Sequence, residues 1–176
     1  MTKRHNPPQQ YEHRRGGKII PAFFNLVGTL LMLGVIALML PSYVPRFMGY
    51  EVYNVVSGSM APAIPVGSMV LVEPEEAELI EPGEVIAFYN GSAVVTHRVL
   101  EIRRISREFV TKGDANENED LAKVPFTSLI GVVRWHVPYL GEFTAFISTV
   151  IGKIYLFALL LCGLLLNVIA GRLREA

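Results

Sequence analysis

Two long apolar segments lie near the two ends of the chain, and a different pattern of apolar and polar residues lies between them. The first, residues 19–40, contains no charged side chain, and its 22 residues would form a helix of about 33 Å. The second, residues 143–170, is apolar except for Lys153, with apolar side chains on one helical face before that lysine. The pattern predicts two transmembrane helices, the second beginning along the membrane interface.

The middle of the chain changes to period-two alternation with many β-branched residues, a pattern typical of strands. Two turn dipeptides, Pro82-Gly83 and Asn90-Gly91, interrupt it. The sequence therefore predicts a mainly β fold: a small β-rich domain, a barrel or sandwich, flanked by N- and C-terminal transmembrane helices. The predicted strands are 68–72, 85–89, 93–102, 108–111 and 129–137.

Charges beside the apolar segments indicate one orientation. Residues 1–18 carry five basic side chains and one acidic one, and Arg172 and Arg174 follow the second segment. Basic flanks tend to remain in the cytoplasm. We therefore expect cytoplasmic tails at residues 1–18 and 171–176, and an extracytoplasmic domain at residues 44–142 of a cell-membrane protein.

The composition narrows the classes of function. Hydrophobic residues make up 51% of the chain and charged residues 18%, which favours a membrane protein. Residues 44–142 contain eight basic and fourteen acidic side chains, which argues against a nucleic-acid partner. The single cysteine, Cys162, lies in an apolar run, so we expect no disulfide framework, no metal site and no cofactor.

Short motifs in the middle of the chain carry groups suited to acyl transfer. Ser59 lies in the run Ser57-Gly58-Ser59-Met60, and a serine hydroxyl becomes a nucleophile when a base takes its proton. His97 lies in a predicted strand, and a neutral imidazole can act as that base. We expect Met60, apolar and unbranched, to suit a site that dips into lipid.

A catalytic histidine usually has a carboxylate on its second ring nitrogen. The two aspartates of the chain, Asp114 and Asp120, lie in one acidic loop after His97, and spacing alone does not choose between them. Each motif also has a purely structural interpretation. The acidic loop would be a solvated loop, the segment at Ser59 a surface turn, and His97 a hydrogen-bonding strand residue.

In this order, the motifs resemble those of signal peptidase I in its endoplasmic-reticulum and archaeal form, which also occurs in some Gram-positive bacteria. The matching segments are 57–64, 96–99 and 112–116, the last continuing to Asp120. Ala61 and Ala63 depart from the pattern, since the family more often has a polar residue and a threonine there.

The resemblance implies a membrane-bound serine endopeptidase, a hydrolase that removes N-terminal signal peptides from translocated preproteins after small residues at substrate positions −1 and −3. It implies Ser59 as the nucleophile, His97 as the base and Asp120 as the acid, with Asp114 as an alternative or supporting acid. It also implies an oxyanion hole formed by the Ser57 hydroxyl and the Ser59 N–H. We expect the substrate to pair as an added strand. The residues expected to bind it are Val55, Val56, Val94, Val95 and Thr96.

The expected partners are preprotein signal peptides and the lipid bilayer, with the secretion translocon as a further candidate. A competing interpretation is a non-catalytic, membrane-anchored β scaffold of an export complex, which needs no reactive serine. A self-cleaving protease of the repressor type is disfavoured by the two anchors and by the lack of a DNA-binding segment.

Overall fold

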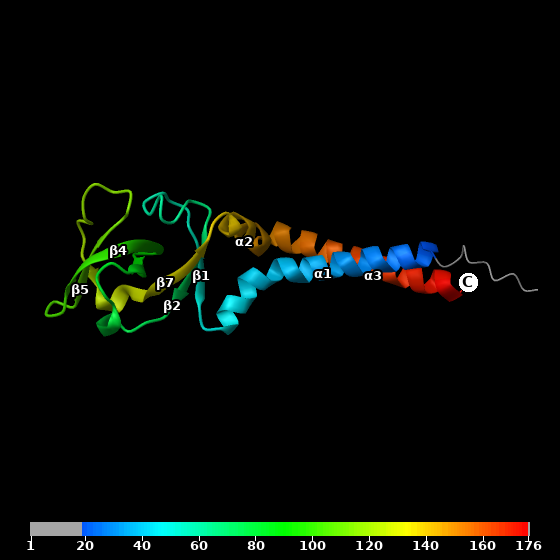
Figure 1. Ribbon diagram of the computed structural model, residues 1–176, viewed down its shortest axis with the longest axis horizontal. Helices are drawn as coiled ribbons and strands as arrows, with labels where there is room; N and C mark the ends of the chain where they lie inside the picture. The colour runs from blue at the N-terminus through cyan, green and yellow to red at the C-terminus, as the bar shows by residue number, and fades with distance from the viewer. Residues whose placement is uncertain (1–18, 176) are drawn as a thin grey trace, which may run out of the picture. The chain divides into compact units, whose positions relative to one another are not determined.

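The computed structural model describes residues 19–175, in which one long helix precedes a seven-stranded sheet in the sequence and another follows it (Figure 1). The predicted tail at residues 1–18 and the last residue, Ala176, lie outside the described residues. The described chain forms two units. One is Ala37–Leu156, which contains the sheet, and the other joins the described residues up to Ile36 with those from Phe157 onward.

The strands pair antiparallel throughout, in the order β1-β2-β7-β3-β4-β5-β6. The five predicted strands are observed. The two short strands β1 and β6 were not predicted, because neither is long enough to display an alternating pattern. The strand bounds are β1 Glu51–Asn54, β2 Met69–Glu73, β3 Val85–Asn90, β4 Ala93–Arg103, β5 Glu108–Lys112, β6 Val124–Pro125 and β7 Leu129–Val137.

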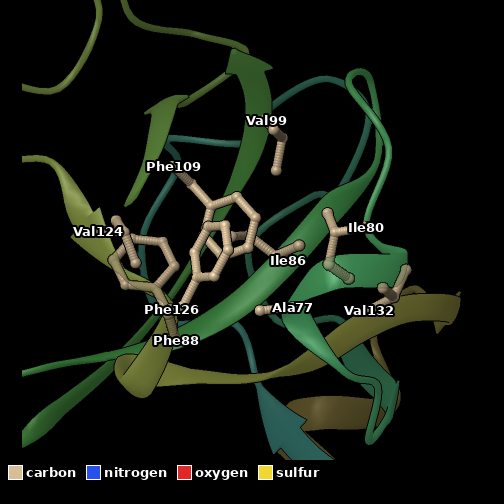
Figure 2. Close-up of a cluster of buried hydrophobic side chains, with 9 residues drawn as sticks. All are labelled: Ala77, Ile80, Ile86, Phe88, Val99, Phe109, Val124, Phe126 and Val132. Carbon is tan, nitrogen blue, oxygen red and sulfur yellow. The ribbon is translucent and has the colours of Figure 1, made fainter. Parts of the chain in front are cut away.

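Side-chain alternation along β3 gives the sheet two apolar faces. Ile86 and Phe88 belong to one core, and Ala87 between them belongs to the other. In the first core the rings of Phe109 and Phe126 stack with their centroids 4.5 Å apart (Figure 2). This core lies beneath β3, β4 and β5, and it fixes the strands that carry the candidate site.

Met60 lies in the second core and is only 1% exposed. The expectation that it dips into lipid is therefore wrong. Its flexible, unbranched side chain instead packs among the apolar side chains of this core. The buried members of this core are Met60, Ile64, Val70, Val72, Ala87 and Ile130.

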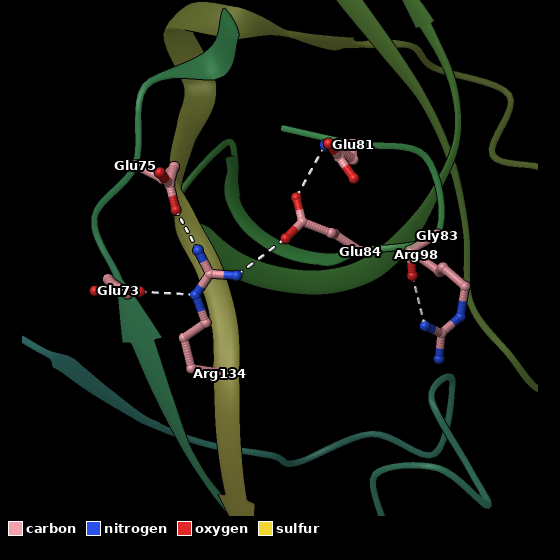
Figure 3. Close-up of polar contacts among 7 residues, drawn as sticks. All are labelled: Glu73, Glu75, Glu81, Gly83, Glu84, Arg98 and Arg134. Carbon is pink, nitrogen blue, oxygen red and sulfur yellow. Dashed lines mark hydrogen bonds and ion pairs between the residues drawn. The ribbon is translucent and has the colours of Figure 1, made fainter. Parts of the chain in front are cut away.

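Arg134 on β7 binds three glutamates, one at the end of β2, one in the following loop and one directly before β3. Its Nε lies 2.7 Å from a carboxylate oxygen of Glu73, its Nη1 lies 3.0 Å from Glu84, and its Nη2 pairs with Glu75 (Figure 3). The hydrogen bond to Glu73 is the largest cause of a raised pKa at the Arg134 guanidinium. One arginine thus anchors the end of β2, the following loop and the start of β3.

Two helices, α1 (Ile19–Phe47) and α3 (Val150–Glu175), are long and apolar enough to cross a membrane. Helix α1 runs beyond the predicted end at residue 40, through Pro41 and Pro45. Each proline removes one N–H donor, but the intervening residues keep helical backbone. The mainly β prediction therefore describes the middle of the chain, since α1, α3 and a shorter helix, α2 (Leu140–Ser148), together contain more residues than the strands do.

Helices α1 and α3 approach closely at two glycines. A Cβ on Gly28 would lie 2.6 Å from the Gly163 carbonyl oxygen, so no larger residue fits without a shift. Beside this contact, the Asn25 amide donates to Asn167 Oδ1 at 2.9 Å, and Asn167 donates to the Gly163 carbonyl at 2.9 Å. Small residues and an amide hydrogen bond are the usual means by which apolar helices associate in lipid.

The second predicted helix is in fact two. Helix α2 ends at Ser148, and α3 begins at Val150, so that Thr149 alone separates them. The Thr149 hydroxyl donates to the Phe146 carbonyl at 2.7 Å and accepts the Gly152 N–H at 3.0 Å. It therefore closes one helix and caps the other, which is a favoured role for threonine.

Helix α2 docks on the sheet at its first turn. The Gly141 N–H donates to the Gly67 carbonyl at 2.9 Å, and the buried Thr144 hydroxyl lies 2.9 Å from Asn54 Oδ1 at the end of β1. A Cβ on Gly141 would lie 2.4 Å from the Ser68 carbonyl oxygen, so the approach requires glycine. This contact holds the segment that leads from β1 toward Ser59.

Candidate active site

His97 on β4 and Asp120 in the loop between β5 and β6 are in direct contact. His97 Nδ1 lies 2.5 Å from Asp120 Oδ2, and the imidazole is buried, packing edge-on against Phe88 with the ring centroids 6.3 Å apart. An ionised carboxylate only accepts hydrogen bonds, so Nδ1 carries the proton in this pair. In its neutral form the ring with this proton presents Nε2 as an acceptor, as a general base requires.

Ser59 lies at the start of a tight turn, and the residues that follow it in this turn are partly buried. The Ala61 N–H donates to the Gly58 carbonyl at 3.0 Å, and the Ile64 N–H donates to the Met60 carbonyl at 2.8 Å. Because Met60 and Ile64 are buried in the second core, the turn is anchored directly beside Ser59. The Ser59 and Ser57 hydroxyl oxygens lie 3.4 Å apart.

Gly113 brings the serine and histidine segments together. A Cβ on this residue would lie 2.6 Å from the Ser59 carbonyl oxygen and 3.0 Å from His97 Nε2. The Ser59 carbonyl also accepts the Ala115 N–H at 2.8 Å. The Nε2 side of the imidazole therefore faces the segment that carries Ser59, while its Nδ1 side faces Asp120.

The three predicted catalytic side chains line one cleft of about 670 Å³. Ser57 and Val95, predicted for the oxyanion hole and for substrate binding, also line it. The remaining lining residues are Phe88, Tyr89, Asn90, Gly91, Asn116, Leu121, Ala122, Lys123, Val124, Pro125 and Ser128.

The other predicted substrate residues lie on the segments beside the cleft. Val56 is 87% exposed, while Val55 and Val94 pack against the second core. The Val55 main chain is already paired: its N–H donates to the Ser68 carbonyl at 2.8 Å, and its carbonyl accepts the Gly67 N–H at 2.9 Å. Additional pairing on this side would therefore fall to Val56 and Ser57.

One edge of β4 is open where the predicted substrate residues lie. Residues Ala93–Arg98 pair with β3 on one side, but pairing with β5 on the other side begins only at Arg98. Within the described part of the chain, no strand covers the β5 side of Val94, Val95 and Thr96. That edge is a site where an extended peptide could add.

Asp114 is engaged away from the imidazole. Arg98 binds its carboxylate in a two-pronged contact, Nε to Oδ1 at 2.9 Å and Nη2 to Oδ2 at 2.6 Å, and this contact raises the pKa of the guanidinium. The third nitrogen, Nη1, donates to the Gly83 carbonyl at 2.8 Å (Figure 3). Asp114 therefore fastens the loop to β4 and to the turn before β3.

Two residues that contact Asp120 were not predicted from the sequence. The Thr111 hydroxyl donates to Asp120 Oδ2 at 2.7 Å, and the Lys123 ammonium lies 3.2 Å from the Asp120 carbonyl. The ammonium also donates to Glu119 at 2.8 Å, which lowers the pKa of that carboxyl group. Neither residue has a sequence signature beyond its nearness to the acidic loop.

Comparison with curated proteins agrees with the motifs. Over 84 residues the chain is 38% identical to signal peptidase I W of Bacillus subtilis, covering 46% of this chain and 44% of that protein. Over 102 residues it is 31% identical to the signal peptidase complex catalytic subunit SEC11C of Homo sapiens, covering 51% and 53%. The predicted resemblance to signal peptidase I is confirmed. No family model matches the chain, and the chain spans about half the length of the signal peptidases that it matches.

Proposed function

We propose that this protein is a membrane-bound serine endopeptidase that removes N-terminal signal peptides from translocated preproteins. The observation that carries the proposal is the common cleft of Ser59, His97 and Asp120, with Nδ1 of the imidazole on the carboxylate and Nε2 facing the serine segment. The similarity to signal peptidase I W and to SEC11C supports the same reaction class.

The reaction follows the order of a serine hydrolase. His97 Nε2 takes the Ser59 proton as the serine oxygen bonds to the scissile carbonyl carbon, and the Asp120 carboxylate stabilises the imidazolium. The imidazolium then gives its proton to the leaving amine, so that the carbon–nitrogen bond breaks and an acyl-enzyme remains. Water, deprotonated by the same imidazole, hydrolyses the ester and restores Ser59.

The developing oxyanion needs donors that are already in place. We assign this role to the Ser59 N–H and to the Ser57 hydroxyl, which lies beside the nucleophile in the cleft. Donors of this kind each contribute about 10²- to 10³-fold to the rate. Asp114, held by Arg98, supports the loop and does not take the role of the acid.

The substrate binds as an extended segment along the open edge of β4, beside Val94, Val95 and Thr96. Val55 and Val56 flank the opposite side near Ser57. Small residues at substrate positions −1 and −3 are selected because larger side chains would collide with the wall of the cleft. The bound partner is the preprotein, delivered in the cell by the secretion translocon.

The membrane confines both partners to one surface. Helices α1 and α3 cross the cell membrane, both termini are cytoplasmic, and residues 44–142 lie outside the cytoplasm. The apolar length of both helices and the basic residues Arg172 and Arg174 at the end of α3 support this topology. Anchoring in one bilayer raises the effective concentration of enzyme and substrate without any additional contact.

Cleavage of a preprotein with alanine at positions −1 and −3 tests the proposal. The full chain, reconstituted in liposomes, should release the signal peptide, and Ser59→Ala should abolish release while leaving the protein folded. Ser106→Ala is the matched control, because Ser106 lies in the exposed turn between β4 and β5. A serine-directed covalent probe should label the wild type at Ser59. Cleavage retained by Ser59→Ala would rule out Ser59 as the nucleophile, and absence of both cleavage and labelling in the wild type would favour the non-catalytic scaffold.

A further inference from the structure

Thr111 is a buried hydroxyl residue that does not line the cleft. It lies on β5 with no exposed surface, and its hydroxyl donates to Asp120 Oδ2 at 2.7 Å. Its carbonyl oxygen accepts the Asp120 N–H at 2.9 Å. The strand residue therefore holds Asp120 through both the main chain and the side chain.

The carboxylate oxygen bound by Thr111 is also the one bound by His97. Asp120 Oδ2 lies 2.7 Å from Thr111 Oγ1 and 2.5 Å from His97 Nδ1. An ionised carboxylate has no proton to give, so both neighbours donate to the same atom. Two donors from two paired strands, β4 and β5, fix the position of that oxygen more firmly than one donor can.

Asp120 requires such support because of where it lies in the chain. It belongs to the irregular segment between β5 and β6, whereas Thr111 and His97 lie on strands. Groups carried by loops need neighbouring hydrogen bonds to keep a productive geometry. The Lys123 ammonium, 3.2 Å from the Asp120 carbonyl, restrains the far side of the same residue.

We propose that Thr111 is a positioning residue whose hydroxyl holds Asp120 Oδ2 in line with the Nδ1–H of His97. This inference rests on the proposed function. The hydroxyl keeps the imidazole in the tautomer whose Nε2 can take the Ser59 proton. It acts through Asp120 and touches no substrate, so its loss should slow the chemical step and leave substrate binding unchanged.

The test compares Thr111→Val with Thr111→Ser in the reconstituted full chain. Valine keeps the buried volume and removes the hydroxyl, so kcat should fall about ten- to a hundredfold with KM unchanged. Serine retains the hydroxyl and should recover kcat to within a few-fold of the wild type. Thr127→Val is the matched control, because Thr127 is exposed and outside the cleft. Wild-type kcat in Thr111→Val, or equal losses in the valine and serine variants, would overturn the inference.

A second readout does not depend on cleavage. In the inactive Ser59→Ala background, proton NMR should show the His97 Nδ1–H at low field, because it forms a short, charge-assisted hydrogen bond. Adding Thr111→Val should shift this resonance upfield or broaden it, and an unchanged resonance would overturn the inference. If the wild type does not cleave but Thr111→Val still changes the His97 resonance, the proposed function is wrong, whereas the positioning of Asp120 and His97 by Thr111 is supported.

Discussion

Replacing Gly113 with alanine should separate Ser59 from His97 without removing any reactive group. The added Cβ would lie 2.6 Å from the Ser59 carbonyl oxygen and 3.0 Å from His97 Nε2, whereas ordinary contact begins at 3.4 Å. The Ser59 main chain would have to move by about 0.8 Å, since a carbonyl oxygen cannot rotate away as a flexible side chain does. Gly113 has no positive φ, so alanine suits its backbone and the effect is one of contact alone.

A displacement of this size is costly for a proton transfer. Misplacing a reacting group by about 1 Å can slow an enzyme about 10²-fold. We therefore expect Gly113→Ala to lower kcat about ten- to a hundredfold and to slow labelling of Ser59 by a serine-directed probe. Circular dichroism should show that the fold is retained.

Release of a signal peptide from a fluorescent preprotein measures the effect. Gly34→Ala is the control for a generic glycine-to-alanine change, because no heavy atom lies within 4 Å of the new Cβ on α1. Wild-type kcat and labelling rate in Gly113→Ala would refute the reasoning, since the serine and histidine segments would then not meet at Gly113.

Further predictions concern the acid, the base and the surface. Asp120→Asn should reduce kcat by about 10⁴-fold, and Asp114→Asn much less, because Asp114 binds Arg98 and not the imidazole; the reverse order in single-turnover cleavage would exchange their roles. His97→Ala should abolish cleavage, because it removes the group that accepts the Ser59 proton. Cleavage retained by this variant would instead indicate another base, such as Lys112. Arg134→Ala should lower the free energy of unfolding by about 1 kcal/mol, because its three ion pairs are partly exposed, and the loss should be smaller in high salt. Chemical denaturation measures this loss. An unchanged denaturation midpoint would show that the three ion pairs of Arg134 contribute nothing to stability.

The features predictable from sequence were those with a repeating or local signature. The apolar runs gave both long helices, and alternation gave the five longer strands. The ends were less accessible, because the extension of α1 through Pro41 and the break at Thr149 depend on single hydrogen-bonding choices. Met60 was misassigned because an apolar side chain beside a polar motif suits either lipid or a core.

The candidate site was predictable as residue types and order, and much less as a network. Ser59, His97 and Asp120 could be named, but spacing did not separate Asp114 from Asp120. That distinction depends on which strand partner lies opposite each loop residue: Arg98 faces one aspartate, and Thr111 faces the other. Such pairings depend on sheet register, which is set by the apolar pattern of both strands and by the turns between them, so the acidic loop alone does not reveal them.

The open edge of β4 has a consequence for which polypeptides can react at all. A strand edge presents main-chain hydrogen-bond donors and acceptors. Only a polypeptide whose own N–H and C=O groups are not already hydrogen-bonded can pair with them. A segment that remains coiled into a helix has already satisfied those groups internally. The site would therefore select substrates first by backbone conformation and only then by side-chain size. A segment that stays helical would not be cleaved, however small its side chains are.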